Sequence, residues 1–273
     1  MLVLLLCLMT AGSAAGVRAG SPVELWERWY AHDPDSTREV DHSAWGSFLA
    51  RYIRIGADSI HRIAYGQVTP ADRRALDDYL AELSRIQISQ YNRAEQLAYW
   101  INLYNALTVT MVLMHYPVAT IRDIDLGNGR SQQGPWDAPM IEVSGQMLSL
   151  NDIQNGIVRP IWRDPRALYA LSCAALSCPN LQPVPFTSDR LDRQLSDAAM
   201  AYVNDPRCIR LEDRQLLVSS LFRWYQADFG GSDRAVIHHL MGFAEPGLAM
   251  KLQQFDRIDG DVFDWRLNDS TSA

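Results

Sequence analysis

The chain of 273 residues is short of lysine, and it has no internal repeat and no cluster of basic residues. Lys251 is the single lysine among 25 basic residues. This excludes a phosphate-binding Gly-Lys-Ser/Thr loop and leaves Lys251 as the only candidate for a catalytic lysine. The net charge is -7, with acidic and basic residues interspersed. A nucleic-acid surface needs a clustered basic face, so we expect no nucleic-acid partner.

Cysteine is also scarce, and only Cys173, Cys178 and Cys208 follow Cys7. In an oxidising compartment three cysteines give one disulfide and one free thiol, so we predict that Cys208 pairs with Cys173 or Cys178. The alternative is that all three are buried and reduced. The Cys-x4-Cys spacing fits a zinc site poorly, and no histidine or second cysteine pair completes four ligands. We therefore expect no metal and no cofactor.

The N-terminus has the pattern of a secretory signal. Leu2 to Met9 is an apolar run, and small residues predominate from Thr10 to Gly20. Cleavage sites of the small-x-small type end at Ala15 and Ala19. We expect residues 1–19 to be removed and the mature protein to be periplasmic or secreted. The run is too short for a spanning helix, which needs roughly 20 apolar residues. Asparagines interrupt the later apolar stretch near residue 100, so we expect no membrane span after signal removal.

Local patterns predict mostly helices. Thr69 and Pro70 open one helix, and Glu95 to about His115 forms a second that is apolar nearly all round, which places it at the centre of the fold. Residues 141–148 and 208–218 predict hairpins, and residues 167–172 predict a strand. No strand–helix–strand alternation runs through the chain. We predict an α+β fold: a helix-rich single domain over residues 22–268, with a central buried helix and a small antiparallel sheet.

Three polar residues interrupt the predicted central helix. Glu95, Asn102 and Asn105 follow each other at steps of seven and three residues, which places them on one stripe. A buried polar side chain without a partner costs roughly 1–3 kcal/mol. The favoured interpretation is that the three residues tie down neighbouring loops. The functional interpretation is that they line a polar cleft and position a ligand.

The segment from Cys173 to Cys178 follows the predicted strand 167–172. A loop that leaves a strand can present a nucleophile, and a cysteine nucleophile needs a low pKa, usually from a nearby histidine. No histidine lies between His115 and His238, so such a partner would come from elsewhere in the fold. A disulfide and inert buried thiols together outweigh catalysis in this segment.

The predicted central helix carries the run EQLAYWINLYNALT, from Glu95 to Thr108. This run resembles the hallmark helix of the domain-of-unknown-function 547 family, here in its exported bacterial members. Further matches follow in the family's order over roughly residues 40 to 268: His115-Tyr116-Pro117, Gly134-Pro135-Trp136-Asp137, Leu148 to Ile153, Arg159-Pro160-Ile161-Trp162, Asp164-Pro165-Arg166, Ser177-Cys178-Pro179 and Trp224-Tyr225 to Gly231. The family's function is unsettled, so the resemblance implies a fold more than a reaction.

The family's usual pattern contains a Glu-His pair in the short helix after the first hairpin, a histidine in the following strand, and a Cys-x4-Cys-Pro segment. Cysteine, histidine and carboxylate together are the arrangement of cysteine hydrolases. In this chain the pair is Gln154-Asn155 and the strand histidine is Leu168. Both replacements remove the imidazole that deprotonates a thiol, although Asn155 keeps part of the shape of histidine.

Three hypotheses follow. The first is a binding or accessory protein with a degenerate cysteine-hydrolase-like site, whose partner is an unidentified ligand or protein. The second is an active cysteine-dependent hydrolase or acyltransferase that uses His115, His42 or another distant histidine. The third is a scaffold with structural cysteines. The missing histidines favour the first and third, and the polar stripe favours the first. The candidate catalytic positions are Cys178 and Cys173, and the candidate binding residues are Glu95, Asn102, Asn105 and Asn155.

Overall fold

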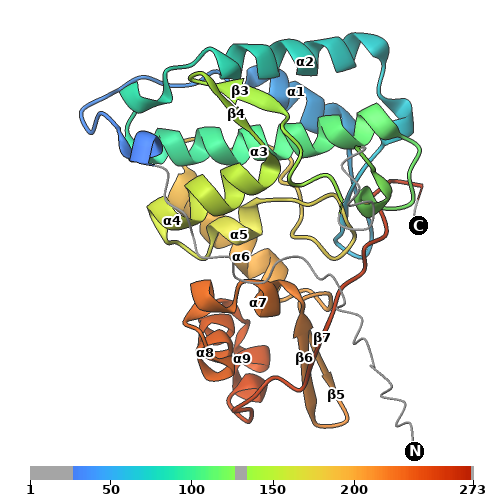
Figure 1. Cartoon of the computed structure of the whole chain (residues 1–273). Helices are drawn as coiled ribbons and strands as arrows, with labels where there is room; N and C mark the ends of the chain where they lie inside the picture. The colour runs from blue at the N-terminus through green and yellow to red at the C-terminus, as the bar shows by residue number, and fades with distance from the viewer. Residues whose placement is uncertain (1–26, 127–133, 272–273) are drawn as a thin grey trace, which may run out of the picture.

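The computed structural model describes residues 27–126 and 134–271 (Figure 1). The predicted signal at residues 1–19, with Cys7, lies outside the described residues. The helices and strands are α1 (Ser43–Tyr52), β1 (Ile53–Ile55), β2 (His61–Ile63), α2 (Pro70–Ser84), α3 (Arg93–His115), β3 (Ile141–Val143), β4 (Gln146–Leu148), the π-helix η5 (Asp152–Val158), α4 (Arg159–Trp162), α5 (Ala167–Ala170), α6 (Leu191–Val203), β5 (Ile209–Glu212), β6 (Gln215–Ser219), α7 (Leu221–Trp224), α8 (Asp233–Phe243), α9 (Pro246–Leu252) and β7 (Gly260–Val262). Short 3-10 helices join them: η1 (Glu27–Tyr30), η2 (Tyr65–Gln67), η3 (Ile88–Gln90), η4 (Ile121–Asp123) and η6 (Gln226–Phe229).

The central helix α3 has the predicted position and environment. Asn92 caps its first turn, because the Asn92 side chain accepts a hydrogen bond from the Glu95 N–H at 3.0 Å. Every residue from Glu95 to Leu113 is buried. By length and composition α3 could cross a membrane, in spite of its asparagines, and it is the one such helix among the described residues. The protein itself buries 94% of its most apolar window, so burial and not composition marks α3 as a core helix.

The α+β class is confirmed, and the strands lie in three small sheets among the described residues. β1–β2 and β3–β4 are antiparallel pairs, and the third sheet has the order β5-β6-β7. β5 and β6 are antiparallel, with Ile209 opposite Val218, whereas β7 is parallel to β6, with Val218 opposite Asp261. Both predicted hairpins are confirmed.

The predicted strand at residues 167–172 is wrong. Ala167–Ala170 is the one-turn helix α5, and the chain becomes extended only at Leu171. All four residues of α5 are buried, and a short apolar run of this kind is compatible with either a buried strand or a buried helical turn. The helical turn begins with a hydrogen bond from the Ala167 N–H to the carbonyl of Asp164 at 3.1 Å.

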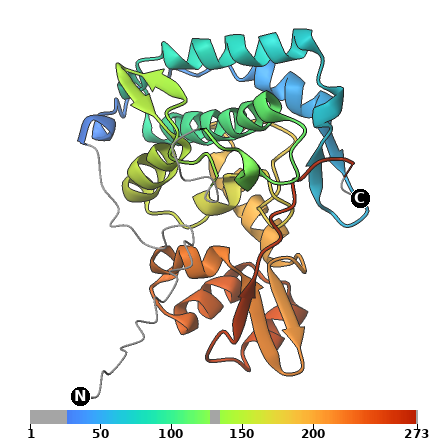
Figure 2. The same ribbon diagram turned by 45° about the vertical axis from the view of Figure 1, so that its right-hand side comes forward.

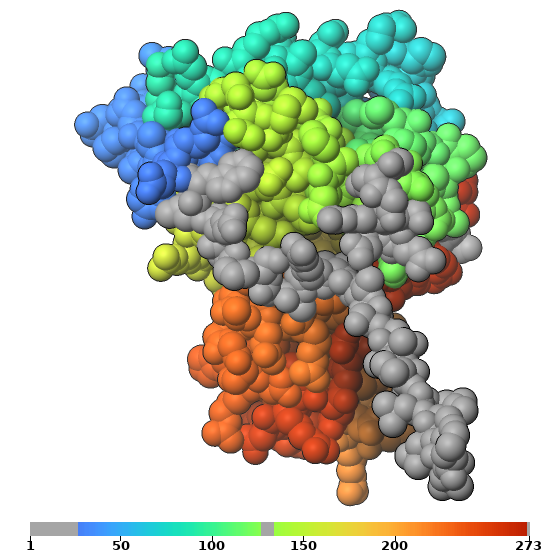
Figure 3. Space-filling model, viewed as in Figure 1, coloured from blue at the N-terminus to red at the C-terminus, as the bar shows by residue number. Residues whose placement is uncertain are grey.

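The buried apolar residues form two clusters. One surrounds α3, and the other is built from α6, the third sheet and the helices α7, α8 and α9. Helix α5 contributes to both, since Ala167 and Ala170 belong to the first cluster and Leu168 and Tyr169 to the second. In Figures 1 and 2, α7–α9 and the third sheet lie together below α3. The space-filling view in Figure 3 shows α7–α9 (orange to red) at the lower end of the molecule.

The C-terminal segment runs from the third sheet back along the molecule to the first hairpin (Figure 2). It is held there through backbone hydrogen bonds. The Ile63 N–H donates to the Asn268 carbonyl at 2.8 Å, and the Ser270 N–H donates to the Ile63 carbonyl at 2.9 Å. Further back, the Leu267 N–H donates to the Ala119 carbonyl at 2.8 Å. The segment that follows β7 therefore connects the third sheet with the part of the fold around α3.

Candidate functional site

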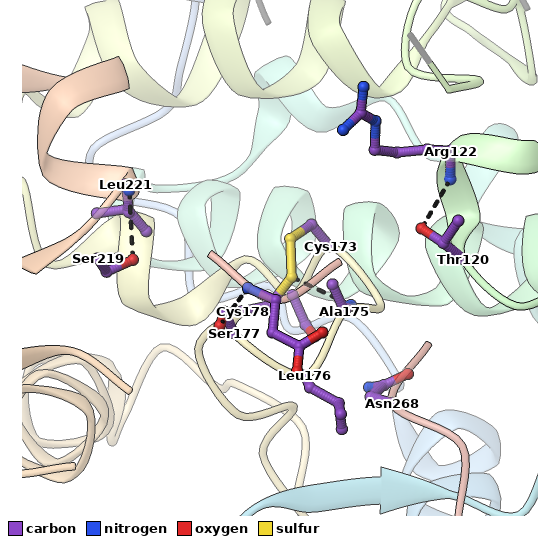
Figure 4. Close-up of a disulfide and its surroundings, with 12 residues drawn as sticks. Thr120, Arg122, Cys173, Ala175, Leu176, Ser177, Cys178, Ser219, Leu221 and Asn268 are labelled. Atoms are coloured by element: carbon purple, nitrogen blue, oxygen red, sulfur yellow. Dashed lines mark hydrogen bonds between the residues drawn. A yellow bond between two sulfur atoms is a disulfide. The ribbon is translucent and has the colours of Figure 1, made fainter. Parts of the chain in front are cut away.

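Cys173 and Cys178 form a disulfide, with their Cα atoms 5.7 Å apart (Figure 4). The predicted pairing with Cys208 is wrong: Cys208 is a free thiol and is completely buried in the second apolar cluster. The chain turns sharply between the two paired cysteines, with Ala174 in the left-handed region at φ 61°. In this structure neither candidate nucleophile is a free thiol.

The segment that contains this disulfide, residues 172–179, is here called the disulfide loop. Several parts of the fold hold it in place. The Tyr202 hydroxyl on α6 donates to the Ser177 carbonyl at 2.8 Å, and Nη1 of Arg207 donates to the Leu176 carbonyl at 2.7 Å. On its other side, Ala175 forms an antiparallel bridge with Leu267 of the C-terminal segment. The loop is thus fixed between α6 and the C-terminal segment.

The histidines named as bases for a cysteine nucleophile are engaged elsewhere. Nδ1 of His42 is hydrogen-bonded to the Tyr79 hydroxyl at 2.6 Å, and burial lowers the pKa of His42 to about 4. Nδ1 of His115 is hydrogen-bonded to the Met111 carbonyl at 2.9 Å. All six histidines are described, and none is hydrogen-bonded to either sulfur of the disulfide.

The two asparagines of α3 each hold a separate backbone segment. Asn102 donates to the Phe186 carbonyl at 2.8 Å and accepts from the Phe186 N–H at 3.0 Å. Asn105 donates to the Ala170 carbonyl at 2.9 Å and accepts from the Ser172 N–H at 2.9 Å. These are buried hydrogen bonds between residues far apart in sequence. The loop-anchoring interpretation therefore accounts for both amide groups, and Asn105 directly supports the start of the disulfide loop.

Glu95 is used in the same way. Its Oε1 atom accepts a hydrogen bond from the Val40 N–H at 2.8 Å, and the residue is 3% exposed. The neighbouring Gln96 has an equivalent role that the sequence did not reveal. Its amide donates to the Ala31 carbonyl at 2.9 Å and to the Ile88 carbonyl at 2.8 Å. The N-terminal half of α3 thus fastens the segments that surround it.

Asn155 belongs to a different group, on the π-helix η5. Its Oδ1 accepts from Nη1 of Arg159 at 2.8 Å, and its amide donates to Oδ1 of Asn151 at 3.2 Å. Arg159 also forms a two-bond ion pair with Asp228 of η6, whose Nε–Oδ1 distance is 3.0 Å. The guanidinium lies 4.7 Å from the centre of the Tyr225 ring. π-Helices are rare and occur frequently at functional sites, so this geometry marks η5 as a candidate site.

We call this group the polar network: Gln154, Asn155, Arg159, Tyr225 and Asp228. Gln154 joins it through a side-chain hydrogen bond to Tyr225, and burial raises the pKa of Tyr225. A neutral phenol, a paired guanidinium and two amides therefore lie together where α4, η5 and η6 meet.

Four half-buried aromatic residues lie beside the polar network and are here called the aromatic cluster: Trp136, Trp224, Phe263 and Trp265. Trp224 and Trp265 are stacked, with ring centres 5.4 Å apart and planes at 29°. The Trp136 ring lies 5.6 Å from Trp265 at a steep angle, and Phe263 lies 4.6 Å from Trp265 and 4.7 Å from Trp224. The Arg122 guanidinium lies 5.2 Å from the centre of the Trp265 ring. The backbone N–H of Arg122 donates to the Thr120 hydroxyl (Figure 4).

Asn151 connects the two groups. Its backbone N–H donates to the Trp136 carbonyl at 2.9 Å, and its side chain accepts from Asn155 and donates to Oδ1 of Asp137 at 2.7 Å. Trp136 is also hydrogen-bonded to the buried Tyr104 hydroxyl of α3. The aromatic cluster and the polar network are thus supported by the central helix and by each other.

Residues 88–203 match the model of a family described as "Protein of unknown function, DUF547". These residues belong to the DUF547 family. The DUF547 segment contains α3, η5, the disulfide loop, Trp136 and Arg159, whereas Trp224, Tyr225, Asp228, Phe263 and Trp265 lie beyond it. No curated protein and no solved structure matches the chain.

Sequence reasoning assigned no role to most of this site. One indication of the site was visible in the sequence: motifs of the family resemblance include Trp136, Arg159 and the pair Trp224-Tyr225. Trp265 follows an acidic stretch near the C-terminus, and nothing in its local pattern indicates packing against Trp136. Among the described residues, no group of three or more His, Cys, Asp or Glu is placed to hold a metal ion.

Proposed function

We propose that this protein is an exported binding or accessory protein with a degenerate cysteine-hydrolase-like site, and that its ligand binds where the polar network meets the aromatic cluster. The disulfide between Cys173 and Cys178 carries the proposal. A thiolate is the nucleophile of a cysteine hydrolase, and these two sulfur atoms are bonded to each other. The Asn155 side chain, in place of a histidine, accepts from Arg159 and is no base.

The arrangement of the site favours a binding role over a purely structural one. A scaffold gains nothing from leaving four aromatic side chains half-buried beside a network of charged and amide groups. A ligand site, in contrast, is lined by aromatic side chains with a few polar groups held in fixed positions. Here the π-helix and the central helix fix those positions, which reduces the entropy that binding costs.

The chemistry of the cysteines supports export. Disulfides persist in oxidising compartments such as the periplasm, and the N-terminal apolar run is typical of a secretory signal. The mature protein recovered from the periplasm or the medium should begin near Gly20 when its intact mass is measured. Recovery of cytoplasmic protein that retains Met1 would contradict export.

Thiol chemistry tests the degenerate site. Denatured, non-reduced mature protein should contain one free thiol, that of Cys208, and the native protein should not react with iodoacetamide. After reduction, the rate of alkylation of Cys173 should rise with pH, with its midpoint at or above the reference thiol pKa of about 8.5. If untreated protein is alkylated fast, and the pH midpoint of the rate lies well below neutral, the proposal is contradicted and an active hydrolase or acyltransferase is favoured.

Ligand screening tests the binding role. Thermal unfolding would be measured with amino acids, dicarboxylates, nucleotides, fatty acids and neutral trisaccharides at millimolar concentration. One class should raise the midpoint of unfolding, and Trp224→Ala should remove that increase. Trp162→Ala is the matched control, because Trp162 is also half-buried but is bonded to the Arg93 carbonyl, away from the aromatic cluster. No increase with any class would contradict the binding role.

A further inference from the structure

The charges of the polar network cancel. Arg159 has 7% of its side chain exposed and Asp228 has 16%, and the two are joined by two hydrogen bonds. The remaining groups of the network are amides and a phenol that burial keeps neutral. A charged ligand placed here would lose its hydration without gaining a counter-charge from the network. The network therefore favours a neutral ligand.

The network also offers planar groups that make several hydrogen bonds at once. The Asn155 amide, the Asp228 carboxylate and the Arg159 guanidinium lie side by side in a bonded row. Each presents a donor or an acceptor in a fixed plane. Neighbouring hydroxyl groups on a ring match such a row, because each hydroxyl donates one hydrogen bond and accepts two.

The aromatic cluster supplies the complementary surface. Trp136, Trp224, Phe263 and Trp265 are all half-buried, so each residue keeps part of its surface accessible. The face of an aromatic ring is electronegative and attracts the slightly positive C–H bonds on one side of a sugar ring. Indole rings are large enough to cover one sugar ring each. Two neighbouring indoles at different angles, Trp136 and Trp265, suit a chain of sugars more than a single flat ligand.

We infer that the ligand of this site is a neutral oligosaccharide, whose rings lie on the aromatic cluster and whose hydroxyl groups bond to Asn155 and Asp228. This inference rests on the proposed binding function and specifies its ligand class. Aromatic and aliphatic ligands would contact the rings but would not use the remaining hydrogen-bonding capacity of the network. Charged ligands of either sign are disfavoured because Arg159 and Asp228 already neutralise each other.

The test is a titration of the mature protein with cellotriose, maltotriose and chitotriose, followed by tryptophan fluorescence and by calorimetry. At least one trisaccharide should bind and change the fluorescence. Trp224→Ala and Asn155→Ala should each weaken that binding about tenfold or more, by removing one stacking surface or one hydrogen-bonding group. Trp162→Ala should change the affinity by less than about twofold, since its ring lies outside the aromatic cluster. Circular dichroism and thermal unfolding establish that each variant is folded. If Trp224→Ala does not fold, Asn155→Ala still tests the site.

Two outcomes would overturn the inference while leaving the binding function intact. In one, another ligand class raises the unfolding midpoint and no trisaccharide binds. In the other, a trisaccharide binds equally well to both site variants, which would place it elsewhere. Failure of every class in the thermal screen would instead remove the binding function and the inference together.

Discussion

Ser177 and Asp264 are hydrogen-bonded to each other twice. The Ser177 N–H donates to the Asp264 carbonyl at 3.1 Å, and the Ser177 hydroxyl accepts from the Asp264 N–H at 2.8 Å. Asp264 lies between Phe263 and Trp265, two members of the aromatic cluster. The disulfide loop therefore holds the backbone that carries half of the aromatic cluster. Breaking the disulfide should accordingly alter the structure of the candidate ligand site.

The first prediction concerns that connection. Replacing Cys173 and Cys178 together by alanine should destabilise the protein by about 2 kcal/mol, because the closed loop is short and restricts the unfolded chain only modestly. Hydrogen exchange should also become faster at Leu176 and Asn268, because their N–H groups donate to the Arg266 and Ala174 carbonyls and join the disulfide loop to the C-terminal segment. Urea unfolding and exchange mass spectrometry measure the two effects. Cys208→Ala is the control, and unchanged exchange at residues 263–268 in the double variant would contradict the connection.

The second prediction concerns the asparagines of α3. In Asn105→Ala the Ala170 carbonyl loses its donor and the Ser172 N–H loses its acceptor, so two buried backbone groups are left unsatisfied. At roughly 1–3 kcal/mol for each group, the free energy of unfolding should fall by about 2–6 kcal/mol. Asn102→Ala should have a similar effect through Phe186. Chemical unfolding measures both, with the exposed Gln253→Ala as control. A loss below about 1 kcal/mol would show that these hydrogen bonds contribute little.

The third prediction concerns the Arg159–Asp228 pair. Breaking a buried ion pair from one side leaves the other charge uncompensated, so Arg159→Met and Asp228→Asn should each cost about 3–5 kcal/mol. The double variant should cost clearly less than their sum. A double-mutant cycle on the free energy of unfolding measures this coupling. The exposed pair Arg234–Asp256 is the matched control and should couple by less than about 1 kcal/mol.

The fourth prediction concerns pH. His42 is 5% exposed, and burial lowers its pKa from 6.5 to about 4. Between these values the unfolded chain binds a proton that the folded protein does not, so stability is lost as the pH falls from about 6.5 through about 4. The loss from this residue should be on the order of 3 kcal/mol.

Urea unfolding at pH 7, 5.5 and 4 measures this dependence. In His42→Gln the slope should be shallower, because the variant side chain does not titrate. The exposed His238→Gln should keep the slope of the unchanged protein. Equal slopes in all three proteins would contradict the assignment to His42.

Much of the fold follows from local patterns. The capping residue Thr69 does accept from the Asp72 N–H, at 3.1 Å, and the apolar circumference of α3 does place that helix in the core. Such signals lie within one or two turns of the chain, where sequence spacing translates directly into geometry. The turn at 167–170 was mistaken for a strand because its apolar residues carry no period.

The site could not be predicted in this way. Trp136 and Trp265 lie far apart in the sequence and meet only because the C-terminal segment returns past the disulfide loop. The pairing of Cys173 with Cys178 depends on the left-handed turn at Ala174, and alanine is not a residue type that predicts a left-handed conformation. The polar stripe on α3 was visible in the sequence, but whether an asparagine binds a ligand or a backbone depends on which segment lies opposite.

The return of the C-terminal segment to Ile63 has a consequence in time. The N–H and carbonyl groups of Ile63, near the start of the chain, are bonded to Asn268 and Ser270, near its end. Ribosomes add about 5–20 residues per second, so these partners are synthesised about 10 to 40 s after Ile63 itself. During that interval the first hairpin is without its last neighbour. The bonding around Ile63 is therefore completed only after Ser270 has been synthesised, which is compatible with the export proposed above.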